Sequence, residues 1–292
     1  MTKIAEAFKN KKAFIGFLTA GDPSLECTEE FIIKMEEAGA ALIEIGIPFS
    51  DPIAEGPVIQ SANIRALSNP NGCTTDQVFE MVERVSKKVS VPLVFLTYLN
   101  PVFKYGYDRF FARCASAGIS GIIVPDMPLE EKGEVADIAA AHGVDVISLI
   151  APTSKERIAK IAKSATGYIY IVSSMGVTGM RSEITTDLES IVRVVKENTS
   201  VPTAIGFGIN TPEQAKKIRR NGRWSHCRKR NRKDYRKIWR KRCRAGVQLR
   251  ERDGRCSQVS HGDRDTNLAT PPVSNGIFNC FINCLIASFC EK

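Results

Sequence analysis

Residues 43–57 have the sequence IEIGIPFSDPIAEGP, in which one acid lies inside an apolar, β-branched run and a Pro- and Gly-rich loop carries two more. The run 41–47 has the near-continuous apolar character of a strand that is buried on both faces. Glu44 would therefore face an apolar interior, where desolvation raises the pKa of a carboxyl group and suits it to proton transfer near neutral pH. The alternative is a structural glutamate at a strand end, paired with a basic residue.

Similar apolar runs alternate with amphipathic segments on both sides of this stretch. The expected strands are 13–19, 41–47, 93–97, 121–124, 145–150, 168–172 and 203–207, and the expected helices are 24–38, 58–67, 75–88, 107–117, 129–142, 154–164, 184–197 and 211–218. Asp22 and Pro23 are expected to supply the cap and first position of the first of these helices. This alternation predicts a parallel α/β sheet. A (β/α)8 TIM barrel is favoured over a doubly wound sheet because functional-looking residues follow successive strands.

The net charge of +9 is distributed unevenly along the 292 residues. Residues 1–218 hold 22 Lys and Arg against 26 Asp and Glu, a net charge of −4, whereas residues 219–292 hold 19 against 6, a net charge of +13. The sequence therefore predicts a barrel domain, 1–218, and a basic, Cys-rich tail, 219–292, that is disordered. No eighth strand is expected in the tail, so strands 13–19 and 203–207 should keep open edges.

Cysteine usage and the N-terminus indicate the compartment. Nine cysteines without regular spacing do not suggest a disulfide framework, and no basic segment leads into an apolar stretch with a cleavage site. A cytoplasmic protein is expected. No cluster with metal-ligand spacing is present in the sequence.

The 43–57 stretch is very similar to the signature of tryptophan synthase α subunits. Further similarities follow in chain order: FLTAGDP at 17–23, TYLNP at 97–101, PDMP at 125–128, YIY at 168–170, GVTG at 176–179 and GFGI at 206–209. The resemblance implies a TIM-barrel lyase that cleaves indole-3-glycerol phosphate to indole and glyceraldehyde 3-phosphate. It also implies no cofactor in this subunit and a partner β subunit, in an α2β2 assembly, that carries pyridoxal phosphate.

The resemblance also implies roles for the matching residues. Glu44 corresponds to the general acid–base glutamate, and Glu55 falls where the family usually has an aspartate, so that its carboxylate, one methylene further out, would accept the indole N–H. Tyr170 is implied in the catalytic pocket, although a strand tyrosine could equally be a core or interface residue. The other implied residues are Phe17, Leu96 and Ile123 for the indole pocket, Gly179 and Gly208 for the phosphate, and Asn100 and Pro101 for the partner subunit. Each of these could instead be an ordinary core or turn residue.

The tail allows three interpretations. Its basic run, with Trp224, Tyr235 and Trp239, could bind nucleic acid by charge and stacking, or it could be a solvated disordered segment. The third interpretation is a frameshift near codons 218–219. Codons shifted by one nucleotide can encode ADGVIAGSAIVKIIEKYG over residues 222–239, which resembles the family's eighth strand, phosphate loop and following helix.

The function predicted from the sequence is therefore the lyase reaction, the last step of L-tryptophan biosynthesis. Two alternatives remain, another phosphate-binding TIM-barrel enzyme such as an epimerase or isomerase, and an inactive truncated barrel whose tail binds polyanions. The 292-residue chain as it stands, without a strand in the eighth position, is predicted to fold poorly. It is also predicted to bind the substrate phosphate weakly, because the phosphate site of such barrels draws on the loops after strands seven and eight.

Overall fold

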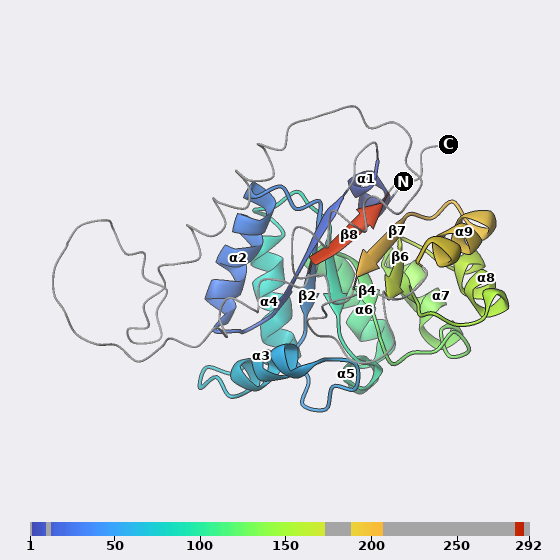
Figure 1. Cartoon of the computed structure of the whole chain (residues 1–292). Helices are drawn as coiled ribbons and strands as arrows, with labels where there is room; N and C mark the ends of the chain where they lie inside the picture. Colours follow the sequence, from blue (N-terminus) through green and yellow to red (C-terminus); the bar gives the residue numbers. More distant parts are fainter. Residues whose placement is uncertain (1, 10–12, 173–187, 207–283, 289–292) are drawn as a thin grey trace.

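The computed structural model describes residues 2–9, 13–172 and 188–206, together with the backbone of 284–288. Seven parallel strands, each hydrogen-bonded to the next, form the wall of a barrel that helices surround (Figure 1). The strands are β1 (Phe14–Thr19), β2 (Leu42–Gly46), β3 (Leu93–Leu96), β4 (Ile119–Ile123), β5 (Asp145–Ile150), β6 (Ile169–Val172) and β7 (Thr203–Gly206). The predicted TIM-barrel architecture is confirmed, and no helix within the described residues is long and apolar enough to cross a membrane.

The helices on the outside follow the predicted segments within a few residues. They are α2 (Leu25–Glu37), α3 (Pro57–Leu67), α4 (Thr75–Val85), α6 (Tyr107–Ala117), α7 (Gly133–Ala141), α8 (Lys155–Lys163) and α9 (Leu188–Asn198). The expected helix at 211–218 lies outside the described residues. The capping prediction for α2 was wrong by two positions, because Ser24, not Asp22, is the N-cap, and its side chain accepts a hydrogen bond from the backbone N–H of Cys27 at 3.2 Å.

Two short helices were not predicted. Helix α1 (Lys3–Ala7) precedes the first strand, and α5 (Leu99–Tyr105) occupies a segment that was expected to be a loop. Pro101 does not interrupt α5 because it lies in the first turn, where a backbone N–H has no partner within the helix.

The prediction of open edges on the first and seventh strands was wrong. A short segment of the tail, β8 (Cys284–Ser288), lies between β1 and β7 and pairs with both in the antiparallel direction (Figure 1). Ile286 is opposite Phe14 on one side and opposite Ile205 on the other, so the hydrogen-bonded ring of strands is closed. Closure satisfies the edge N–H and C=O groups of both strands, whatever the direction of the inserted strand.

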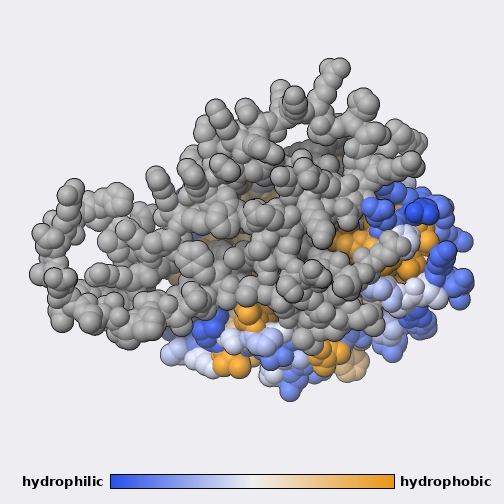
Figure 2. Space-filling view, in the orientation of Figure 1, coloured by the Kyte–Doolittle hydropathy of each residue, from blue (hydrophilic) through white to orange (hydrophobic). Residues whose placement is uncertain are grey.

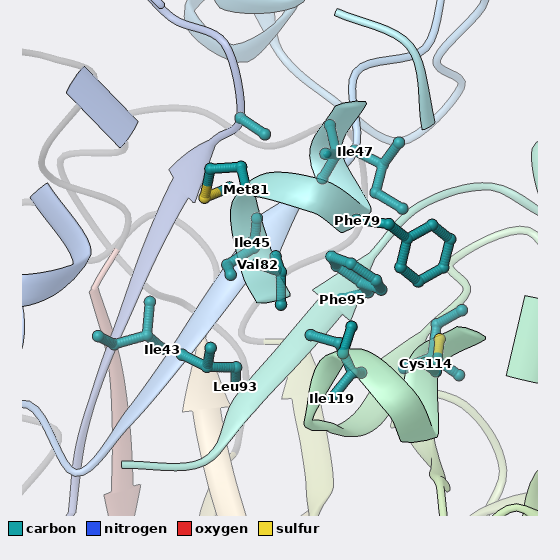
Figure 3. Packing of buried hydrophobic residues seen from close by; sticks show 14 of the residues in the cluster. Ile43, Ile45, Ile47, Phe79, Met81, Val82, Leu93, Phe95, Cys114 and Ile119 are labelled. Carbon is teal, nitrogen blue, oxygen red and sulfur yellow. The ribbon is translucent and has the colours of Figure 1, made fainter. Parts of the chain in front are cut away.

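Strand alternation divides the core into an outer and an inner layer. In β2, Ile43 and Ile45 point outward and pack with Phe95 of β3 and Phe79 of α4 (Figure 3). The rings of Phe79 and Phe95 meet edge to face with centroids 5.3 Å apart. Leu42 and its inward neighbours on other strands form a separate cluster inside the barrel. Glu44, which has the parity of Leu42, is therefore directed into the barrel interior.

Helix α1 packs against the interior cluster from the amino-terminal end of the strands. Ile4 and Phe8 are fully buried in this cluster, and the Phe8 ring lies 5.5 Å from the ring of Tyr168. A Cβ on Gly121 would come within 2.9 Å of Ile4 Cδ1 and 3.0 Å of the carbonyl oxygen of Asp145, so this approach needs glycine. The loops at the opposite end of the barrel remain for a site.

Candidate active site

Glu44 lies inside the barrel with 1% of its surface exposed. Its Oε1 accepts a short hydrogen bond from the phenolic hydroxyl of Tyr168, 124 residues away in sequence. Burial raises the pKa of the carboxyl group to about 7, and the hydrogen bond from Tyr168 only partly opposes this rise. The sequence also allowed a structural Glu44 paired with a basic residue. Among the described residues the partner of Glu44 is instead the neutral hydroxyl of Tyr168. At neutral pH, Glu44 can both give and take a proton.

Two tyrosines of the sixth strand region face Glu44. Tyr168 and Tyr170 share the same parity and both belong to the interior cluster. Burial raises the pKa of Tyr170 well above its ordinary value, and the nearby charge of Glu44 adds to the rise, so Tyr170 stays neutral. The sequence assigned a role only to Tyr170. The direct contact belongs to Tyr168, which the alternation of side chains along the strand could have indicated.

The three residues predicted for the indole pocket all face the interior. Phe17 of β1 is opposite Glu44 in the strand register, and Leu96 of β3 is opposite Ile123 of β4. The Phe17 ring also lies over Gly46, where a Cβ would come within 3.0 Å of the ring carbon Cζ. The structure therefore places an apolar side chain, Phe17, beside Glu44, and two more, Leu96 and Ile123, nearer the carboxyl ends of the strands.

Glu55 lies in the loop between β2 and α3 and is also buried, with 6% of its surface exposed. Its Oε2 has no hydrogen-bond partner among the described residues. Burial raises the pKa of Glu55, a hydrogen bond with Tyr98 lowers it, and the charge of Asp126 raises it. An unpartnered carboxylate oxygen in a buried position is an acceptor that lacks only its donor.

Asp126 follows the fourth strand and approaches the same region. Its Oδ1 accepts the backbone N–H of Leu99 at 2.9 Å, which fixes the start of α5. Asn100 and Pro101 lie next in α5, where Asn100 is exposed and Pro101 is half-buried. Of the remaining predicted residues, Gly179 and Gly208 lie outside the described residues. No group of His, Cys, Asp or Glu suited to holding a metal ion occurs within the described part of the chain.

Comparison with known proteins extends these observations. The family model for the tryptophan synthase alpha chain matches residues 4–223. The alpha chain of Lacticaseibacillus casei is 53% identical over 215 residues, which are 74% of this chain and 80% of that protein. The corresponding protein of Lactiplantibacillus plantarum is 50% identical over 216 residues, with coverage of 74% and 81%.

Solved structures give the same result. The alpha chain from Legionella pneumophila superposes with a TM-score of 0.67 at 35% identity, covering 76% of this chain and 84% of that chain. A chain from the Pyrococcus furiosus tryptophan synthase a2b2 complex superposes with a TM-score of 0.66 at 36% identity, covering 72% and 84%.

A parallel barrel with a desolvated carboxyl group at its centre and a second acid in an adjacent loop defines a TIM-barrel enzyme equipped for proton transfer. The chain belongs to the tryptophan synthase alpha chain family. The reaction of this family is the cleavage of indole-3-glycerol phosphate to indole and glyceraldehyde 3-phosphate, and the chain is a lyase of this type.

Proposed function

We propose that Glu44 is the general acid–base of the cleavage reaction. Protonated Glu44 donates its proton to C3 of the indole ring, which turns the ring into an electron sink. The bond between C3 and the glycerol carbon then breaks, and its electron pair restores the aromatic ring. The same carboxylate takes the proton of the adjacent hydroxyl, which becomes the aldehyde, so that the proton balance closes. The observation that carries this proposal is the pKa of about 7, which lets one group act in both directions.

Glu55 is proposed to accept the indole N–H. Protonation at C3 places positive charge on the ring nitrogen, and a carboxylate at hydrogen-bond distance stabilises that charge most strongly in the transition state. The support is the buried, unpartnered Oε2. Tyr170 lies beside Glu44 and stays neutral, and we propose that it helps to shape the pocket around the reacting carbon together with Phe17, Leu96 and Ile123.

Gly179 and Gly208 are proposed to bring backbone N–H groups to the substrate phosphate. The other half of a barrel phosphate site normally comes from the loop after the eighth strand. Here β8 runs the opposite way: its last residue, Ser288, is opposite Thr203 at the start of β7. The carboxyl end of β8 therefore lies at the end of the barrel away from the site. Weak phosphate binding by this chain remains the expectation.

We propose that the tail from about residue 219 is the out-of-frame continuation of the gene. The family model ends at residue 223, and the similarity to the L. casei protein leaves a fifth of that relative unmatched while this chain continues. Resequencing the gene around codons 218–219 tests this proposal, which fails if the shifted frame does not encode an eighth strand followed by a Gly-Ser loop.

The partner is proposed to be a β subunit that carries pyridoxal phosphate and receives the indole. The P. furiosus relatives are described as members of a complex. In this chain, four exposed apolar residues lie on α3, on α5 and in the loop before α3, namely Ile53, Ile64, Leu67 and Phe103. Figure 2 shows apolar surface along the lower edge of the molecule, where Figure 1 places α3 and α5. Asn100 and Pro101 lie on the same helix as Phe103.

The cytoplasmic location stays a prediction.

The test of the proposed chemistry is indole release from indole-3-glycerol phosphate by the chain and by its Glu44→Gln variant. Glutamine keeps the size of the side chain but cannot transfer a proton, so kcat should fall by at least about 100-fold. The control is Glu80→Gln on the exposed face of α4, which should leave kcat unchanged. Equal turnover by the wild type and the Glu44 variant would disprove the assignment.

A further inference from the structure

Tyr98 contacts the loop that carries Glu55 through its ring and through its hydroxyl group. The Tyr98 ring packs on Phe49 with centroids 5.4 Å apart, and its hydroxyl oxygen accepts the backbone N–H of Ala54 at 2.9 Å. The same hydroxyl lies near the Glu55 carboxyl and lowers the pKa of that group. With 2% of its surface exposed, Tyr98 is almost fully buried, so these contacts are shielded from water.

The Tyr98 hydroxyl holds the backbone of this loop and leaves the acid available. Because its oxygen accepts the Ala54 N–H, its proton remains available to the neighbouring Glu55 carboxylate. Oε2 of Glu55 has no hydrogen-bond partner among the described residues, so this oxygen is left for a ligand.

The backbone on the far side of Tyr98 is fixed as well. The next residue, Leu99, donates its N–H to Asp126 at 2.9 Å, and α5 begins there. Asp126 accepts from the backbone, and its negative charge raises the pKa of Glu55. Tyr98 is therefore the side chain that connects the end of the third strand to the acid in the loop after the second.

We propose that Tyr98 is a positioning residue that aims the free carboxylate oxygen of Glu55 at the N–H of the indole ring. This inference rests on the proposed role of Glu55 as the indole acceptor and adds the group that orients it. A glutamate has one more side-chain torsion than an aspartate, so its carboxylate is less restricted by the backbone. The bond between Tyr98 and Ala54 fixes the backbone next to Glu55 before the substrate binds, which lowers the entropic cost of binding.

The first test needs no substrate. In the full chain, Tyr98→Phe keeps the ring on Phe49 and removes only the hydroxyl. Hydrogen exchange at the Ala54 amide should become about 5-fold to 10-fold faster. The pKa of Glu55, followed by carbon NMR of its carboxyl group, should rise further, because the Tyr98 hydroxyl lowers it.

The matched control is Tyr105→Phe at the end of α5, the helix whose N-cap is Tyr98. The Tyr105 hydroxyl donates to Asp76 at 2.6 Å, on the outside of the barrel. This variant should change neither the exchange of Ala54 nor the titration of Glu55. If Tyr98→Phe also leaves both unchanged, the contact with Glu55 does not restrain the loop, and the inference is overturned.

The second test measures whether Glu55 is directed at the indole N–H. It compares the affinity of the chain for indole and for benzofuran, which replaces the N–H with an oxygen of similar size. The wild type should prefer indole about 10-fold, Tyr98→Phe should lose most of this preference, and Tyr105→Phe should keep it. In a Glu55→Gln background, Tyr98→Phe should have little further effect. A preference retained by Tyr98→Phe would overturn the positioning role. A wild type with no preference would instead refute Glu55 as the acceptor, while the exchange and titration results would still establish the contact.

Discussion

Replacing Glu44 with Gln should make the protein more resistant to alkaline pH. The folded state holds the pKa of Glu44 at about 7, against an ordinary value of 4.5. Because the folded pKa is raised, the folded state binds the proton more tightly than the unfolded state, and stability falls as pH rises from about 4.5 through 7. With about 1.36 kcal/mol per pKa unit, the full penalty above pH 8 is roughly 3 kcal/mol, and most of it, about 2 to 3 kcal/mol, develops between pH 5 and pH 8.

The assay is urea denaturation of the 292-residue chain at pH 5 and pH 8. Glutamine cannot ionise, so Glu44→Gln should lose less stability between these pH values than the wild type, by about 2 to 3 kcal/mol. The comparison between pH values cancels any constant effect of the unpaired amide N–H introduced by the substitution. The exposed control Glu80→Gln should follow the wild type. If Glu44→Gln and the wild type lose the same stability, Glu44 is not a desolvated acid in the folded protein.

Three further outcomes are expected. The kcat/KM for cleavage should fall as pH rises above about 7, because protonated Glu44 is the form that donates to C3, and a rate that is flat from pH 6 to pH 9 would contradict this assignment. Phe103→Asp should weaken binding of a β subunit by at least about 10-fold in titration calorimetry, because it puts a charge into an apolar contact. The control Lys163→Asp on α8 should leave the affinity unchanged. Equal affinities of the wild type and Phe103→Asp would show that α5 is not part of the interface. A chain restored to the shifted frame should bind inorganic phosphate at least about 10-fold more tightly than the literal chain, and equal binding would show that the eighth loop is dispensable.

The strands could be predicted closely because each is buried on both faces. Strand β5 begins at Asp145 and ends at Ile150, as expected from its apolar run, and the others differ from prediction by no more than two residues. Helix α5 could not be predicted because it is only seven residues long and contains Pro101, so that neither its periodicity nor its composition distinguishes it from a loop.

The contacts of the acids could be predicted only in part. Alternation along the second strand is enough to turn Glu44 inward, but its contact with Tyr168 depends on the register of the four strand pairings from β2 to β6. The bond between Tyr98 and the loop at Ala54 likewise joins residues that are 44 positions apart. Resemblance to a family identified Glu55 as a candidate, whereas its buried, unpartnered oxygen is visible only in the folded chain.

By itself, the sequence determined that the first three quarters of this chain form βα units with an acid directed into the barrel, since side-chain alternation and apolar periodicity are local properties. Only the tertiary structure decided what that acid touches, which oxygen of Glu55 remains free, and how the barrel closes. Closure by β8 shows the physical reason: the edges of β1 and β7 require hydrogen-bond partners, and an antiparallel segment more than 70 residues further along the chain supplies them without the local pattern of a barrel unit.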